Sequence, residues 1–148
     1  MRFLSIGADG SIPAMTLMMQ KEAAERFTAK PGDRVYGPLT VLAGYYYEVT
    51  KLMELSRDMY YPQPDVDSVV LKLTAKGAEK LPELEWLLNR AFAMRRKTLS
   101  NNLRAAGISD ERLKSLLGAC GIEGNIRAEK LTVAQFANIA REIEAHGK

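Results

Sequence analysis

The sequence has few of the residues that build metal and disulfide sites. Cys120 is the only cysteine, which excludes an internal disulfide and a cysteine-based zinc site. His146 is the only histidine and lies near the end of the chain, so histidine-based catalysis or metal binding has little support. No glycine-rich phosphate loop, nucleophile elbow or zinc spacing is present. We therefore expect neither a metal site nor a complete cofactor site in this chain.

Long apolar runs are also missing. No run approaches the length that spans a bilayer, and the apolar patch after Met1 is interrupted by Gly7, Asp9 and Gly10, which is too broken for a signal peptide. A single cysteine fits a reducing compartment. These features predict a cytoplasmic protein with no membrane association.

Acidic residues are absent from one segment. Residues 1–76 contain nine basic and nine acidic residues, whereas residues 77–148 contain twelve basic and nine acidic ones. The excess is local, because no acid interrupts the cations Arg90, Arg95, Arg96, Lys97 and Arg104. A cationic surface of this kind suits a phosphate backbone.

The first half of the chain alternates between strand and helix patterns. Residues 1–8 fit a helix end or a frayed segment, followed by a turn at residues 9–11. Residues 12–19 are apolar on both faces, as in a strand of a covered sheet, with a helix as the competing interpretation. The remaining patterns predict helices over 20–29 and from Pro38, a strand over 47–55, a loop over 56–64, and a strand over 66–73 that pairs with the preceding one.

The second half has helical patterns only. A polar stretch over residues 74–82 separates the halves, so we expect one domain over 1–75 and another over 76–148. Helices are predicted from the apolar stripe at Leu84–Ala91, over the basic segment 89–104, from Ser109 to about Gly118, and after the capping box of Thr132 and Gln135.

The organisation is thus an α/β part with about three strands, of which the last pair is antiparallel, followed by an all-α part. A fully apolar strand normally has more sheet beside it. The strands therefore read as a portion of a larger sheet.

The loop before the last strand contains Tyr60, Tyr61, Pro62 and Pro64. Prolines spaced in this way hold a loop extended. The tyrosines offer a stacking surface to an unpaired base, or one or both pack beneath the loop. The two interpretations are compatible if one tyrosine anchors the loop and the other is presented.

The basic segment also has two interpretations. Arginine and lysine neutralise phosphates, and the amides of Asn101 and Asn102 can bond to sugars or base edges. The alternative is an ordinary solvated helix face, although such faces usually mix both signs of charge.

Four segments resemble the ribosomal RNA adenine dimethyltransferases: residues 15–27 (MTLMMQKEAAERF), 36–43 (YGPLTVLA), 60–70 (YYPQPDVDSVV) and 91–103 (AFAMRRKTLSNNL). The ending at residues 126–136 (IRAEKLTVAQF) agrees as well. This resemblance implies a Rossmann-like methyltransferase that uses S-adenosylmethionine to dimethylate N6 of two adjacent adenines in 16S rRNA.

Only the C-terminal half of that family is matched. Family members carry a glycine-rich cofactor loop and an Asn-Leu-Pro-Tyr catalytic motif, and neither occurs in this sequence. The resemblance therefore implies a remnant of the methyltransferase sheet followed by a helical rRNA-binding domain. S-adenosylmethionine is the cofactor of the full-length family, and we expect this chain not to bind it well.

The resemblance also implies roles for individual residues. Tyr60 matches the family aromatic that contacts the flipped adenine, with Pro62 and Pro64 shaping its loop. The matched basic helix grips rRNA, and we assign to it Arg90, Arg95, Arg96, Lys97, Asn101, Asn102 and Arg104. Asp65 stands where the family commonly has lysine and Pro38 where arginine is common, and both departures remove positive charge.

The hypothesis is therefore the rRNA-binding C-terminal portion of a dimethyltransferase that does not methylate alone. Its expected partner is small-subunit rRNA or the immature 30S subunit. The alternative is a non-catalytic interaction module whose open sheet edge binds another protein, a second copy, or a complementing N-terminal half.

Overall fold

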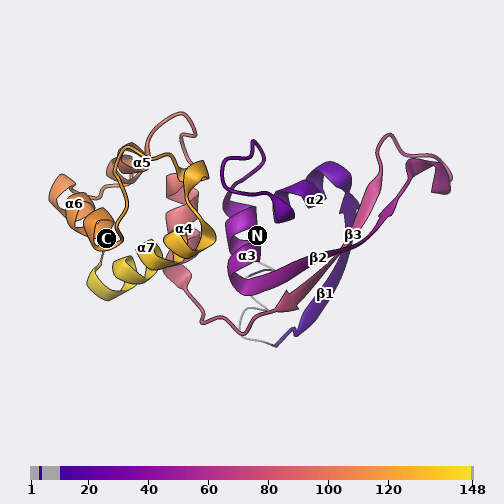
Figure 1. The fold of residues 1–148 in the computed structure, drawn as a ribbon, viewed down its shortest axis with the longest axis horizontal. Helices are drawn as coiled ribbons and strands as arrows, with labels where there is room; N and C mark the ends of the chain where they lie inside the picture. The colour runs from indigo at the N-terminus through magenta and orange to yellow at the C-terminus, as the bar shows by residue number, and fades with distance from the viewer. Residues whose placement is uncertain (1–3, 5–10, 148) are drawn as a thin grey trace.

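In this computed structural model, residue 4 and residues 11–147 are described. The expectations for residues 1–8 and for the turn at residues 9–11 therefore fall outside the described part, except at Leu4 and Ser11. Figure 1 shows the elements, which are β1 (Ala14–Gln20), α2 (Lys21–Thr28), α3 (Pro38–Tyr46), β2 (Tyr47–Leu55), η2 (Arg57–Met59), β3 (Ser68–Ala75), α4 (Pro82–Ala91), α5 (Leu99–Ala105), α6 (Asp110–Ala119), η3 (Ala128–Lys130) and α7 (Val133–His146). None of the described helices combines the length and the apolar character needed to cross a membrane.

The three strands form one antiparallel sheet in the order β1-β3-β2. Leu71 of the central strand lies opposite Leu17 on one side and Lys51 on the other. The three predicted strands are confirmed, and so is the antiparallel pairing of the last two, with ends that differ by one or two residues. The fold class is likewise confirmed as a small α/β part followed by helices.

The prediction that β1 lies inside a covered sheet is wrong. Its side chains alternate, with Met15, Leu17 and Met19 packed partly buried against the core, whereas Met18 is 61% exposed. Helices α2 and α3 pack against one face of the sheet (Figure 1). The apolar residues on the other face of β1 therefore meet solvent.

Local sequence explains where the first helices end and begin. After α2 the chain turns at Gly32, whose φ of 98° lies in the left-handed region that glycine adopts without strain. Asp33 Oδ2 accepts a hydrogen bond of 2.7 Å from the Lys30 amide and closes this turn. Pro38 is the first residue of α3, where its missing N–H costs nothing. The sequence predicts the end of α2 near residue 29 and the start of α3 at Pro38.

Side-chain caps define the C-terminal helices. The hydroxyls of Thr98, Ser109 and Thr132 each accept a hydrogen bond from a backbone amide in the first turn of α5, α6 and α7, respectively. Gln135 Oε1 in turn accepts from the Thr132 amide at 2.9 Å, which completes the predicted capping box. The predicted stripe along α4 is fully buried.

The junction between the two parts of the chain is built around Tyr36. Its ring packs beside Phe92, which stacks on Phe136 of α7, and its hydroxyl donates a 2.7 Å hydrogen bond to the Leu131 carbonyl. One apolar core extends from the sheet into the helices. The domain boundary after residue 75 remains a prediction, although the change from strands to helices falls there.

The prediction of one continuous basic helix over residues 89–104 is wrong. Helix α4 ends at Ala91 and α5 begins at Leu99, so residues 92–98, called the basic loop below, are turns. Asn102, which is 2% exposed, explains the break. Its Oδ1 accepts from the Met94 amide at 2.9 Å and its Nδ2 donates to the Met94 carbonyl at 3.1 Å. These bonds replace the helical bonds that Met94 would otherwise make.

Replacing Tyr36 with phenylalanine should destabilise the chain by about 1–2 kcal/mol at neutral pH, because the Leu131 carbonyl loses its donor in a buried place. Burial raises the pKa of Tyr36 to about 12 from its ordinary value of 10.0. The stabilisation is therefore fully present below pH 10 and is lost as the pH rises toward 12. Denaturant unfolding at several alkaline pH values should show that the free energies of unfolding of the wild type and the Tyr36→Phe variant converge as the pH rises. Parallel profiles would contradict this account.

Replacing Asn102 with alanine should cost about 1–3 kcal/mol, because the part-buried Met94 amide loses its acceptor and the Met94 carbonyl keeps only the Lys97 amide as a donor. The neighbouring variant Asn101→Ala is the control, since Asn101 is exposed and its loss should change stability by no more than about 0.5 kcal/mol. Chemical unfolding measures both values, and amide exchange at Met94 reports whether the loop opens locally. Equal stability of the two variants would show that the buried amide does not hold the loop.

Candidate nucleic-acid interface

The basic loop presents two unpaired cations. Arg96 and Lys97 are exposed, and neither side chain has a hydrogen bond or an ion pair with any residue in the described part of the chain. The Lys97 amide donates to the Met94 carbonyl at 2.9 Å, so the backbone beneath them is a closed turn. Two free cations on a fixed backbone suit contacts to phosphates.

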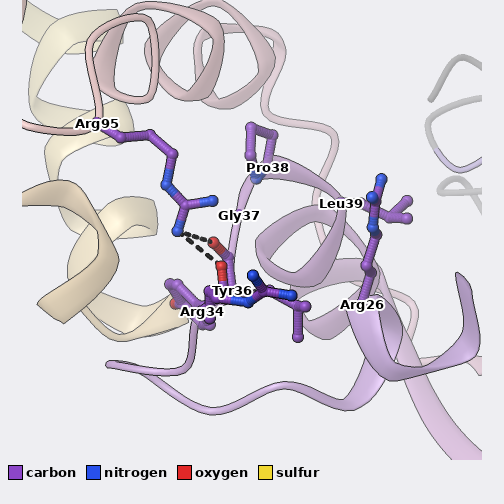
Figure 2. Close-up of a pocket in the computed structure, with 8 residues that line it drawn as sticks. Arg26, Arg34, Tyr36, Gly37, Pro38, Leu39 and Arg95 are labelled. Carbon is purple, nitrogen blue, oxygen red and sulfur yellow. Dashed lines mark hydrogen bonds between the residues drawn. The ribbon is translucent and has the colours of Figure 1, made fainter. Parts of the chain in front are cut away.

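Arg95 has a different environment, although it is next in sequence. Its Nη2 donates to the Arg34 carbonyl at 2.9 Å and lies 3.5 Å from the Tyr36 carbonyl. Figure 2 shows the guanidinium reaching from the basic loop toward the segment before α3. Arg95 therefore joins the two parts of the chain and is not an independent surface cation.

The other residues of the predicted set divide further. Arg104 forms an ion pair with Asp110 at 2.6 Å, and its Nη1 donates to Asn101 Oδ1 at 2.8 Å, so much of its charge is neutralised. Arg90 lies exposed in the last turn of α4. Asn102 is buried, and its assignment as an RNA contact is corrected here to the support of the basic loop.

The hairpin tip, residues 56–67 between β2 and β3, presents the two tyrosines differently. Tyr60 is half-buried, with its hydroxyl 3.6 Å from the sulfur of Met18 on β1, whereas Tyr61 is fully exposed. Pro62 follows a cis peptide bond and is exposed, and Pro64 is half-buried. The structure thus has one tyrosine that anchors the tip and one that is presented.

Hydrogen bonds within the hairpin tip fix its shape. Asp67 Oδ1 accepts from the Arg57 amide at 3.0 Å, and the Arg57 guanidinium donates to the Asp65 carbonyl at 3.3 Å. Gln63 Nε2 donates to the carboxylate of Asp58. Asp65 itself is exposed, so its negative charge faces solvent beside the tyrosines.

The structure does not bring the basic loop and the hairpin tip together. Figure 1 shows the tip at one end of the long axis, beyond β2 and β3, and the turn between α4 and α5 toward the other end. The two predicted groups therefore contact separate parts of any common ligand. A ligand that touches both must be extended.

Two arginines that sequence reasoning did not select line one cavity together with Arg95. Arg26 of α2 and Arg34 of the loop before α3 line a cavity of about 410 Å³ together with Arg95 (Figure 2). Arg26 lies in α2 and Arg34 lies in the segment between α2 and α3, and no local pattern in the sequence marks them as a pair. Arg95 is 61 residues from Arg34, and no local pattern predicts that approach.

No group of three or more histidine, cysteine, aspartate or glutamate side chains in the described residues is arranged to hold a metal ion. A second hollow, of about 470 Å³ at the base of the hairpin tip, is lined by Lys21, Glu22, Glu25, Arg57, Asp65, Val66 and Asp67. Neither this hollow nor the cavity lined by Arg26, Arg34 and Arg95 combines a glycine-rich turn with an acidic side chain in its wall. The cavity with the three arginines is strongly cationic.

Comparison with known proteins places these features in a family. The family model described as ribosomal RNA adenine dimethylase matches residues 2–145. The ribosomal RNA small subunit methyltransferase A of Lactobacillus helveticus is 40% identical over 144 residues, which are 93% of this chain and 48% of that protein. The enzyme of the same name from Natranaerobius thermophilus is 39% identical over 138 residues, covering 89% of this chain and 46% of the relative.

Solved structures agree with the fold. The crystal structure of a dimethyladenosine transferase from Plasmodium falciparum has a TM-score of 0.76 and 25% sequence identity to this chain. The match covers 96% of this chain and 62% of the Plasmodium chain. The 23S rRNA methyltransferase ErmE matches with a TM-score of 0.61 at 19% identity, over 89% of this chain and 55% of its own, and supports the fold alone. This chain spans about half the length of the curated relatives it matches. Because the family model extends over nearly all of its residues, the chain belongs to the ribosomal RNA adenine dimethylase family.

Proposed function

We propose that this chain is the rRNA-binding portion of an S-adenosylmethionine-dependent adenine N6,N6-dimethyltransferase of the small ribosomal subunit, and that it does not methylate by itself. The observation that carries the proposal is the basic loop, where Arg96 and Lys97 are exposed and unpaired within the described residues. The partner is the RNA of the small subunit, free or in an immature 30S particle.

The charges of the basic loop favour the RNA backbone as the ligand. A phosphate oxygen accepts hydrogen bonds from the guanidinium fork of Arg96 and from the ammonium of Lys97. Arg90 is exposed in the last turn of α4, two residues before the basic loop begins. Such contacts position a protein on RNA without reading its sequence, which suits a part of the enzyme that orients the substrate.

The hairpin tip supplies the proposed adenine contact. Tyr60 is the candidate, as the resemblance implies, and Tyr61 offers a second, fully exposed ring beside it. A base stacked on an aromatic ring gains about 1–3 kcal/mol. Stacking helps to hold a flipped base out of its helix, but it supplies no methyl group.

The chain does not suit S-adenosylmethionine. The cavity near α3 is lined by three arginines, which repel the positively charged sulfonium of that cofactor. The hollow below the hairpin tip has no aromatic residue in its wall and lacks the apolar surface that an adenosyl group prefers. These features support the proposal that methyl transfer requires further protein.

The isolated chain should form no dimethyladenosine when it is incubated with labelled S-adenosylmethionine and immature small subunits. The physical reason is that no residue described above holds the methyl donor in line with N6, and alignment supplies much of the rate of such a transfer. Counting label in the extracted rRNA measures the reaction, with a full-length family member as the positive control. Label above background in the dimethyladenosine fraction would refute this part of the proposal.

The double variant Arg96→Ala, Lys97→Ala should bind small-subunit rRNA about tenfold more weakly at moderate salt, and its plot of log K against log salt should lose about 1–2 units of slope. The charge-matched control is the double variant Lys72→Ala, Lys80→Ala. Lys72 is exposed on β3, and Lys80 is exposed in the segment between β3 and α4. Filter binding or fluorescence anisotropy over a salt series gives both quantities.

The control variant should retain the wild-type slope. If the wild-type chain fails to bind rRNA, or if both double variants lose equal slope, the assignment of RNA binding to the basic loop is wrong.

A second candidate function, a protein-interaction or self-association module, is favoured by one observation. β1 is an edge strand of the described sheet, and Met18 of β1 and Met53 of β2 are 61% and 51% exposed. Open strand edges pair with other chains. Under this alternative the Arg96→Ala, Lys97→Ala variant keeps the wild-type slope of log K against log salt. Light scattering at high protein concentration then shows a dimer.

A further inference from the structure

The cavity beside α3 lies where the two parts of the chain meet. It has a volume of about 410 Å³, and its wall consists of Arg26, Arg34, Val35, Tyr36, Gly37, Pro38, Leu39 and Arg95. These residues come from α2, from the segment that leads into α3, and from the basic loop. Arg95 is the residue that the helical part contributes to the cavity, and the other lining residues lie between residues 26 and 39.

The charge of the wall is entirely positive. Three of the lining residues are arginines and none is acidic. Neither Arg26 nor Arg34 has a side-chain hydrogen bond or an ion pair with any residue in the described part of the chain. Three cations around one hollow create a local positive potential, which attracts an anion.

Arg95 is held in place before any ligand arrives. Its Nη2 is engaged by the Arg34 and Tyr36 carbonyls, while a guanidinium carries five N–H donors in a rigid fork. The remaining donors stay available beside the cavity (Figure 2). The same bonds satisfy two carbonyl oxygens that would otherwise repel an anion. Little side-chain freedom of Arg95 is then lost on binding.

The remaining lining side chains have no groups that distinguish bases. Val35, Pro38 and Leu39 are apolar, and Pro38 has no N–H to donate to an anion. Recognition must therefore come from the arginines, which bond to phosphate oxygens, and the apolar wall adds no base-specific donor or acceptor. This combination fits a contact to the backbone of a nucleic acid, which positions the strand without selecting its sequence.

We propose that Arg26, Arg34 and Arg95 form a binding site for one phosphodiester group of the rRNA, separate from the contacts of Arg96 and Lys97. The inference rests on the proposed function and extends it to a site that the resemblance did not include, since Arg26 and Arg34 lie outside the basic loop. The occupied site ties the RNA to both parts of the chain at once. The occupied site thereby fixes the path of the RNA strand from the basic loop toward the β-sheet.

The test uses the full chain and the double variant Arg26→Ala, Arg34→Ala. Affinity for small-subunit rRNA should fall about tenfold at moderate salt, with a loss of about 1–2 units in the salt slope. The loss should be the same for RNAs of different sequence. The double variant Arg26→Lys, Arg34→Lys keeps the charge but loses the fork, so its affinity should lie between those of the wild type and the alanine variant. Replacement of Lys72 and Lys80 is again the charge-matched control.

A second arm uses inorganic phosphate as the probe. At matched ionic strength, phosphate in place of chloride should raise the unfolding midpoint of the wild-type chain by more than that of the Arg26→Ala, Arg34→Ala variant, which shows only the general stabilisation by phosphate. Because both arginines are exposed, the alanine variant should unfold at the wild-type midpoint in chloride, which separates loss of binding from loss of fold.

The outcomes distinguish this inference from the proposed function. If rRNA binding depends on Arg96 and Lys97 but not on Arg26 and Arg34, the phosphodiester site is overturned and the proposed function stands. If phosphate stabilises the wild type but rRNA affinity is unchanged in the variant, the cavity takes free phosphate and the RNA assignment is overturned. If the wild-type chain binds no rRNA, the proposed function itself fails.

Discussion

The docking of Tyr36 against the helical part is the interaction on which the rest of the structure depends. Its ring packs on Phe92, its hydroxyl is bonded to the Leu131 carbonyl, and the nearby Gly32 amide donates to the Glu129 carbonyl at 2.7 Å. These contacts attach the segment before α3 to the turn before α7. Contacts of α3 with α4 and α7, and the bonds of Arg95 to the Arg34 and Tyr36 carbonyls, support the same junction. The junction is thus both an apolar seam and a set of directional bonds.

The same junction determines which cations are free. Arg95 reaches across it to two carbonyl oxygens, whereas Arg96 and Lys97 remain at the surface. Asn102 supports the turn from below by bonding both backbone groups of Met94. Three consecutive basic residues therefore have two distinct environments. The difference arises because a turn, unlike a helix, directs neighbouring side chains according to local hydrogen bonds and not according to a fixed period.

Much of the candidate site was predictable because its residue types are locally unusual. A run of cations without acids indicates an anionic ligand whatever the backbone does, and a Tyr-Tyr-Pro-Gln-Pro segment indicates an extended, presented loop. The break between α4 and α5 was not predictable from these patterns. It depends on one buried amide that makes tertiary hydrogen bonds, and Asn102 on its own reads as a polar surface residue. The prediction that both faces of β1 are covered failed for a related reason, since an apolar strand does not reveal how many of its faces other elements will cover.

By itself, the sequence determined the element types outside residues 92–98, the caps at Ser109 and Thr132, the family resemblance and the cationic character of residues 90–104. Those features depend on neighbours within a few positions, where propensity, periodicity and capping chemistry act. Only the tertiary structure decided that Arg95 turns inward, that Asn102 is buried, and that Arg26 and Arg34 join Arg95 around one cavity. These positions are brought together by the packing of α3 and its preceding loop against the helices, and no local pattern encodes a contact between residues 61 positions apart.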